Sequence, residues 1–239
     1  MYANDSMNPY ASFGLAAEAG VDERAAFITK TYLHLAGAVG CFALLTAALL
    51  QLPGIERFAG TMVSGYNWLI VMAAYMGVSY LAQKWAMSAT SMGTQYLGLG
   101  LYVVAEAVIF VPILLMASMF YENAIATAAI ITGVTFAGLT GIVFVTRKDF
   151  SFLGPILGVF GMAMMGVVIC SVLFGFSLGI VFTGVMVAMM CGYIVYDTSN
   201  VLHHYHIGQH VAASLALFAS VVTLFWYILR LVMILNDER

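Results

Sequence analysis

The chain has 239 residues, of which 63% are hydrophobic and only 8% are charged. A soluble domain carries about a quarter charged residues, so this composition excludes an ordinary soluble fold. The formal net charge is −3, and the sequence has no run of Lys and Arg that could neutralise the phosphates of a nucleic acid. The sequence therefore predicts an integral membrane protein that does not bind nucleic acid.

A polar segment of 28 residues opens the chain. It lacks the basic start and the apolar centre of a cleaved signal peptide, so we interpret it as a mature tail. The remaining length suits one domain built from spans of about 20 residues. We therefore predict a polar cytoplasmic tail over residues 1–28 and a single transmembrane domain over residues 29–239.

Seven apolar stretches follow the tail, each long enough to cross a hydrocarbon core of about 30 Å as a helix. A helix is also the conformation that satisfies backbone polar groups in lipid without a partner strand. The stretches are Thr31–Leu52, Tyr66–Gln83, Gly93–Ala117, Asn123–Val145, Phe152–Phe174, Ser177–Leu202 and Val211–Leu235. The predicted fold is an all-α membrane protein, a bundle of seven transmembrane helices.

The positions of Lys and Arg predict how the bundle sits in the membrane, because cytoplasmic loops carry an excess of these residues. With the N-terminus inside, five of the eight basic residues lie on the cytoplasmic side. These five are Arg24, Lys30, Lys84, Arg147 and Lys148. We expect a cytoplasmic N-terminus and a C-terminus outside.

Two acidic residues lie within the apolar stretches, Asp197 near the end of the sixth and Glu106 in the third. An acid inside a membrane is costly unless it faces the bundle or water, so each is a candidate for an ion pathway or a pH sensor. Each also has a purely structural interpretation. Asp197 could be a carboxylate at the membrane interface, and Glu106 could be a neutral acid bonded to a neighbouring helix.

The last stretch carries small and polar residues at helical spacing on one side, with leucines opposite them. The polar side consists of Ala213, Ala216, Ser220, Thr223, Tyr227 and Arg230, and the leucines are Leu217, Leu224 and Leu231. Lipid offers a polar stripe no partners, so it should face other helices. We predict that this helix is central in the bundle and that Arg230 belongs to the candidate pathway.

Histidines are concentrated between residues 203 and 210, where His206 and His210 have the spacing that zinc and iron sites use on helices. Histidines in a loop are more often solvated, and no metalloprotease or hydrolase motif accompanies them. The three cysteines are an odd number within apolar stretches, which argues against disulfides. We predict no metal, no cofactor and no enzymatic activity.

Two regions resemble a known family, the Bax inhibitor-1 family. They are Tyr196-Asp197-Thr198 with the Ala-Ala-Ser-Leu-Ala-Leu-Phe run at 212–218, and Leu224-Phe225-Trp226-Tyr227-Ile228-Leu229-Arg230. Residues 146–154, with Asp197-Thr198-Ser199-Asn200, are more similar to the bacterial branch that modulates the FtsH-type membrane AAA protease. The resemblance implies a seven-helix bundle with a central last helix, in a bacterial inner membrane.

The family resemblance also implies a site. Many members pair an aspartate in the sixth span with a second aspartate in the seventh, and this pair senses pH and gates a calcium leak. Asp197 matches the first aspartate, but Ser220 stands where the second is expected. Two close carboxylates share a proton, whereas a hydroxyl is a neutral partner, so pH switching should be weaker here.

From these features we expect a protein that binds and modulates a membrane-bound AAA protease through its polar tail. The alternative is a pH-sensitive leak channel or a cation/proton exchanger, with calcium as the transported ion and Asp197 on the pathway. A metal-dependent membrane hydrolase that uses His206, His210 and Asp197 is the remaining alternative.

Overall fold

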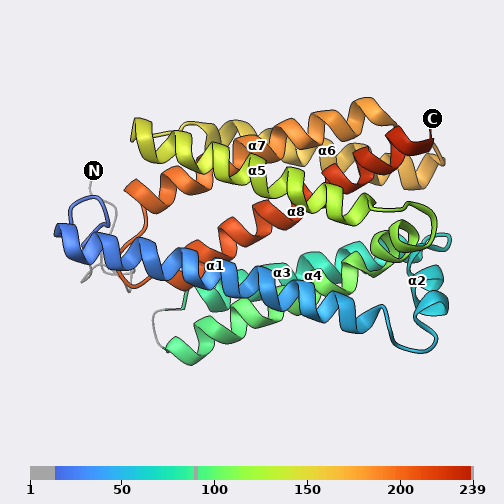
Figure 1. The fold of residues 1–239 in the computed structure, drawn as a ribbon, viewed down its shortest axis with the longest axis horizontal. Coiled ribbons are helices and arrows are strands. Elements are labelled where there is room, and N and C mark those ends of the chain that lie inside the picture. The colour runs from blue at the N-terminus through green and yellow to red at the C-terminus, as the bar shows by residue number, and fades with distance from the viewer. Residues whose placement is uncertain (1–13, 89–90, 238–239) are drawn as a thin grey trace.

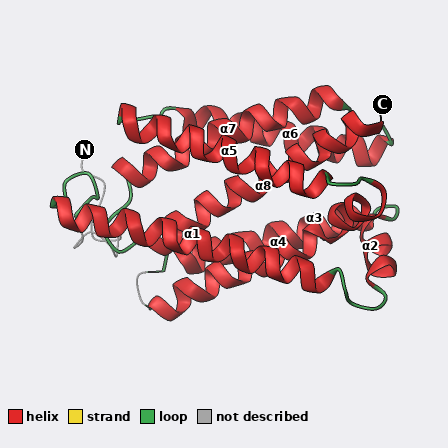
Figure 2. Cartoon of the chain, viewed as in Figure 1, coloured by secondary structure: helices red, strands yellow, loops and turns green. Residues whose placement is uncertain are grey.

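The computed structural model describes residues 14–88 and 91–237, and within them it contains eight helices and no strand (Figures 1 and 2). An isolated antiparallel bridge joins Leu15 to His206. The helices are α1 (Val21–Leu49), α2 (Ile55–Val63), α3 (Asn67–Ala86), α4 (Met92–Phe120), α5 (Ala124–Thr146), α6 (Leu153–Phe174), α7 (Ile180–His203) and α8 (His210–Asp237). All except the nine-residue α2 run along the long axis of one bundle (Figure 1).

Among the described residues, six helices are long and apolar enough to cross a membrane, namely α1 and α4 to α8. This confirms the prediction of an all-α membrane protein. The count of seven spans is not confirmed. Of the seven predicted spans, the one that does not meet these criteria corresponds to α3. This helix has 20 residues and lies in the bundle, but it carries Gln83 and Lys84 near its end. These two polar residues lower its mean hydropathy.

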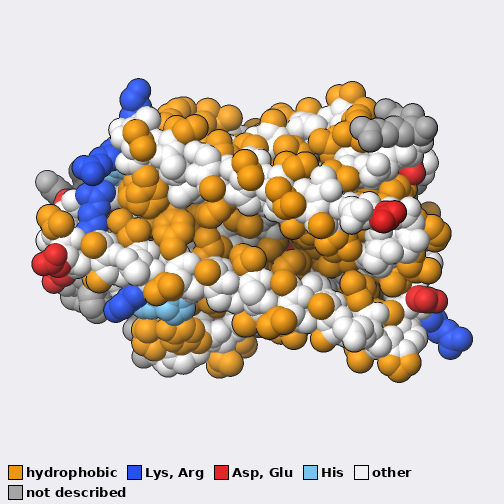
Figure 3. Space-filling view, in the orientation of Figure 1, with side chains coloured by type: hydrophobic (Ala, Val, Ile, Leu, Met, Phe, Trp, Pro, Cys, Tyr) orange, Lys and Arg blue, Asp and Glu red, His pale blue; other side chains and the backbone are white. Residues whose placement is uncertain are grey.

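Large apolar side chains cover much of the outer surface (Figure 3). Leu44 of α1, Val134 of α5 and Met162 of α6 are 74%, 69% and 70% exposed. In water such a surface would drive aggregation, whereas lipid chains solvate it at no cost. The exposed apolar surface therefore fits a bundle surrounded by a bilayer.

The last helix, α8, is the centre of the bundle, because it packs against α1, α3, α4, α5 and α7. Its buried residues include Ser220 from the predicted polar side and both Leu217 and Leu224 from the opposite side. The central position was predicted, but the helix does not have one buried and one open side. It is surrounded by protein because neighbouring helices cover its leucines as well.

The first helix starts earlier than the apolar pattern indicates. It begins at Val21, inside the segment expected to be a polar tail, and it carries Asp22 and Glu23 in its first turn. Acidic side chains there stabilise the positive end of the helix dipole. The first turns of α1 are therefore a polar extension of the first span.

The N-terminal side of the chain and the C-terminus lie at opposite ends of the bundle (Figure 1). At the N-terminal end α1 begins, α3 joins α4, α5 ends, and α7 joins α8. The five basic residues predicted to be cytoplasmic belong to these segments, and we call this end the basic end. Their common location fits the predicted orientation, although the side of the membrane remains a prediction.

Helices α3 and α4 approach each other closely at Gly98. A Cβ atom there would lie 2.5 Å from both the carbonyl oxygen of Ala82 and the amide nitrogen of Ala86. Small residues at such a crossing allow backbones in a membrane to pack tightly. Gly100, two residues further along α4, has no atom within 4 Å of its own added Cβ.

These two glycines give a test of the packing. We expect Gly98→Ala to destabilise the protein by about 1–3 kcal/mol, because overpacking must push the helices apart. Gly100→Ala should be neutral or stabilising by up to about 1 kcal/mol, the difference in helix propensity. Denaturation of the purified proteins in detergent measures both, and equal stability of the two variants would contradict the close approach.

Candidate functional site

Asp197 lies one and a half turns before the end of α7 and is 8% exposed. Its Oδ2 atom accepts a hydrogen bond of 2.5 Å from the hydroxyl of Ser220 on α8. The spacing of buried residues explains this position, because Ile194, Thr198 and Val201 also turn into the bundle on the same helix. The structure thus brings together Asp197 and Ser220, as the sequence predicts.

The Asp197–Ser220 pair lines a cavity of about 270 Å³ near the basic end. Four elements build it: the end of α3, the end of α7, the connection between α7 and α8, and the first half of α8. Its polar lining residues besides the pair are Gln83, Tyr193 and Tyr205. No Lys, Arg or second acid is among the residues that line it. Asp197 is therefore the one carboxyl group that faces this cavity in the described part of the chain.

Tyr205 forms part of the cavity wall from the connection between α7 and α8. Burial raises the pKa of its hydroxyl, and the nearby Asp197 raises it further, so the phenol stays neutral. Its backbone is held by the N-terminal segment. Ala16 N–H donates to the Tyr205 carbonyl at 2.9 Å, and Ile207 N–H donates to the Gly14 carbonyl at 3.1 Å. Residues 14–16 therefore brace the wall of the cavity.

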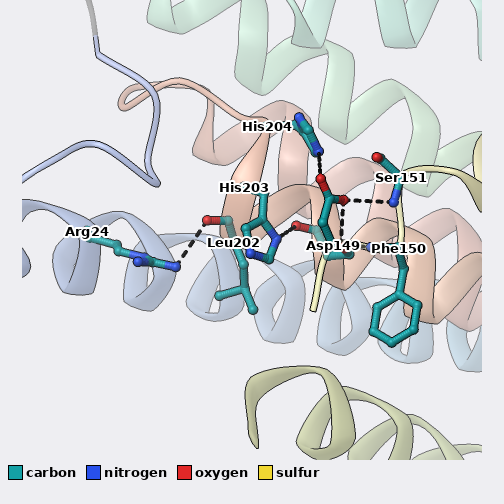
Figure 4. Close-up of polar contacts among 8 residues, drawn as sticks. Arg24, Asp149, Phe150, Ser151, Leu202, His203 and His204 are labelled. Atoms are coloured by element: carbon teal, nitrogen blue, oxygen red, sulfur yellow. Dashed lines mark hydrogen bonds and ion pairs between the residues drawn. The ribbon is translucent and has the colours of Figure 1, made fainter. Parts of the chain in front are cut away.

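A second polar network lies at the basic end, around Asp149 in the connection between α5 and α6 (Figure 4). Asp149 Oδ2 pairs with His204 Nε2 at 3.0 Å, and its Oδ1 accepts the Ser151 N–H at 2.8 Å. The Phe150 N–H donates to the Ser199 hydroxyl at 2.8 Å. These contacts tie the α5–α6 connection to the end of the helix that carries Asp197.

Helix α1 joins the same end of α7 independently, since Arg24 Nη2 donates to the Leu202 carbonyl at 3.2 Å (Figure 4). His203 Nδ1 lies 3.0 Å from the Ser199 carbonyl one turn earlier in α7. Three segments far apart in the sequence therefore meet at the last turn of this helix.

The Asp149 contacts have a pH dependence whose sign follows from the pKa. The Ser151 N–H holds the pKa of the Asp149 carboxyl below its usual value, and His204 lowers it further. A lowered pKa means that the carboxylate stabilises the fold above its unfolded pKa of about 3.9. That stabilisation is lost as the pH falls through the lower, folded-state pKa.

We therefore expect Asp149→Asn to destabilise the protein at neutral pH by no more than about 1 kcal/mol, because the pair is half exposed. The difference from wild type should shrink as the pH falls below about 5 and vanish in strong acid. Thermal unfolding in detergent across this range measures it, with Glu122→Gln at the opposite end as the control. A difference that persists unchanged in acid would contradict the ion-pair contribution.

The other predicted pathway residues lie elsewhere. Glu106 is 2% exposed and accepts a 2.5 Å hydrogen bond from Tyr75 of α3, whose hydroxyl also lies 3.1 Å from that of Tyr102. Arg230 Nη2 donates to the Leu178 carbonyl at 2.5 Å, before the start of α7. Neither residue lines the Asp197 cavity. Glu106 is bonded to a neighbouring helix, as its structural interpretation proposed.

The remaining motif residues support the packing of α7. A Cβ atom on Gly154 of α6 would lie 2.8–2.9 Å from the ring of Tyr196, so this glycine lets the two helices meet. The Asn200 carbonyl accepts the backbone N–H groups of His204 and Tyr205. Thr198 is fully buried, and its hydroxyl has no hydrogen-bond partner among the described residues.

The two histidines of the metal hypothesis play different parts. The backbone of His206 pairs with Leu15, whereas the His210 ring lies 5.0 Å from that of His34 on α1. Within the described residues, no three side chains of His, Cys, Asp or Glu are grouped so that they could hold a metal ion. His206 precedes α8 and His210 begins it, so the two residues do not share a helix, as the metal hypothesis required.

Together, the buried acid, the cavity and the lipid-facing surface define a polytopic helical membrane protein with a polar site at one end of its central helix pair. Comparison with known proteins identifies its family. A family model described as "Inhibitor of apoptosis-promoting Bax1" matches residues 24–237. The chain belongs to this family, the Bax inhibitor-1 family, as the sequence motifs indicated.

Individual relatives agree with this assignment. Protein LIFEGUARD 4 of Arabidopsis thaliana is 29% identical over 86% of this chain and 83% of its own length. Bax inhibitor 1 of Schizosaccharomyces pombe is 24% identical over 98% of this chain and 86% of its own. The Golgi anti-apoptotic protein of Vaccinia virus (strain Lister) is 29% identical over about half of each chain.

Proposed function

We propose that this protein provides a pH-responsive pathway for cations, with calcium as the transported ion, and that Asp197 is its switch. The observation that carries the proposal is the Ser220–Asp197 hydrogen bond inside a cavity next to the basic end. The geometry thus favours the cation pathway, which the sequence analysis gave as the alternative to protease modulation.

The chemistry of the pair supports a switch. A hydroxyl can donate to a carboxylate and can also accept from a protonated acid, so Ser220 serves both states of Asp197. The ionised form attracts a cation into the cavity, and the protonated form does not. The surrounding tyrosines and Gln83 can solvate an ion or water without adding charge of their own.

Calcium flux into proteoliposomes, measured at one acidic and one alkaline pH, tests this proposal. We expect wild type to leak more at the alkaline pH, where Asp197 is ionised, and Asp197→Asn to fall to the level of protein-free liposomes at both. Ser220→Asp should steepen the pH dependence, because two close carboxylates share one proton.

Ser214→Ala is the matched control for changes at Ser220, since Ser214 lies on the same helix and donates only to the Val211 carbonyl in its own turn. It should leak like wild type. An Asp197→Ala protein that leaks like wild type would remove this residue from any pathway and overturn the proposal.

The second candidate function is binding and modulation of a membrane-bound AAA protease, as in the bacterial branch that residues 146–154 resemble. The favouring observation is that the N-terminal segment docks at the basic end, where Ala16 is fully buried against the α7–α8 connection. The basic end is the face at which an ATP-driven protease on the same side would meet this segment. This proposal includes the bacterial inner membrane and the cytoplasmic N-terminus.

Deletion of residues 2–20 should abolish engagement by an FtsH-type protease in a reconstituted assay, because the proposal has the protease bind the protein through this tail. Asp197→Ala, which leaves the tail intact, is the control and should be engaged like wild type. Unchanged degradation of the deleted protein would dispose of this function without affecting the cation pathway.

A further inference from the structure

Helices α3 and α4 pack side by side, and the second buried acid, Glu106, lies between them (Figure 1). Glu106 is near the middle of α4, about 21 Å from its first residue. The hydroxyl of Tyr75 on α3 donates to its Oε1 atom at 2.5 Å. The Tyr102 hydroxyl lies 3.1 Å from that of Tyr75 and is also close to the carboxyl group. Two phenols therefore hold this acid in the middle of a span.

The surroundings of Glu106 suit a bound proton better than a bound cation. Both groups that contact the carboxyl group are neutral phenols. Beyond them lie apolar rings, since Tyr102 packs on Phe218 of α8 with ring centroids 6.1 Å apart, and Phe110 is one turn further along α4. An ionised acid at this depth is costly without a cation beside it, whereas a protonated one is not.

A row of polar side chains on α3 leads from Glu106 to the Asp197 cavity. Tyr75, Ser79 and Gln83 follow one another at steps of four residues, so they lie on one face of the helix. The Ser79 hydroxyl lies close to that of Tyr75, and Gln83 lines the cavity. The row therefore joins the buried acid to the cavity over about 12 Å of helix.

Ser79 lies in the middle of this row, is 9% exposed, and has no hydrogen-bond partner for its hydroxyl among the described residues. Other serines in the bundle donate to a carbonyl of their own turn, as Ser118 and Ser214 do. A buried hydroxyl without a partner is costly, so this one is placed to bond a molecule that enters from the cavity. A single water spans the turn between Ser79 and Gln83, because two O–H···O bonds cover about 5.5 Å.

We propose that Glu106 is a second proton-binding site and that it exchanges its proton with water in the Asp197 cavity. The relay runs through Tyr75, Ser79 and a water molecule held by Gln83. This site goes beyond the proposed cation pathway. It does not require Asp197 to carry an ion, because the cavity serves here only as the source of water.

The relay conserves every proton. Ser79 accepts a proton from the water beside Gln83 and passes its own to Tyr75, which passes its own to the Glu106 carboxylate. A hydroxyl can accept one hydrogen bond while it donates another, so each step uses groups already in place. Each hydroxyl ends with one proton, and the net transfer is one proton from cavity water to the carboxylate. The reverse sequence returns it.

Infrared spectroscopy of the full chain in liposomes, transferred from H2O to D2O at neutral pH, tests this site. A protonated carboxyl group has its own carbonyl band, and the band that Glu106→Gln removes belongs to Glu106. In wild type we expect this band to shift as deuterium replaces the proton. In Ser79→Ala the band should remain, but its shift should be about tenfold slower, because one step of the relay is lost.

Ser118→Ala is the matched control, since Ser118 donates to the Leu115 carbonyl in its own turn of α4. It should exchange at the wild-type rate. Tyr75→Phe is a second variant on the row and should also exchange more slowly, with Tyr80→Phe on the exposed side of α3 as its control.

The readout is exchange at Glu106 and not a calcium flux, so a failed cation pathway and a failed proton site are told apart. A wild-type protein without a Glu106 carbonyl band would overturn the proposal. Exchange in Ser79→Ala and Tyr75→Phe that is as fast as in their controls would also overturn it.

Discussion

The hydrogen bond between Ser220 and Asp197 joins the two helices on which the rest of the bundle depends. It lies where α7 and α8 run side by side, and α8 in turn contacts α1, α3, α4 and α5. A carboxyl group at this depth must face protein or water, so it can exist only if a neighbouring helix supplies a partner. The central position of α8 and the burial of Asp197 therefore have the same cause, which is that the carboxyl group needs a partner from a neighbouring helix.

Much of this could be predicted from the sequence because membranes restrict the choices. Apolar stretches of about 20 residues must be helices, and a stripe containing Ser220 must meet protein. The family motif around Asp197 then identified its partner. The predicted count of seven spans is not confirmed at α3, because Gln83 and Lys84 near its end make it less apolar than the six helices that meet the length and hydropathy of a span.

Other parts of the site could not be predicted because they depend on contacts between distant residues. Asp149 meets His204 across 55 positions, and Ala16 meets Tyr205 across most of the chain. The periodicity of apolar residues along the sequence does not predict which distant residues form such pairs. Likewise, Glu106 and Arg230 were reasonable pathway candidates by their burial cost, but only the fold shows that each has a partner away from the cavity.

The bridge between the N-terminal segment and the α7–α8 connection has a mechanical consequence. Two backbone hydrogen bonds, from Ala16 to Tyr205 and from Ile207 to Gly14, fasten the chain before α1 to the wall of the Asp197 cavity. Tension applied to the N-terminus would load these two bonds before it reached any membrane helix. A force on the N-terminal segment would therefore reach the wall of the Asp197 cavity at Tyr205 before it reached α1.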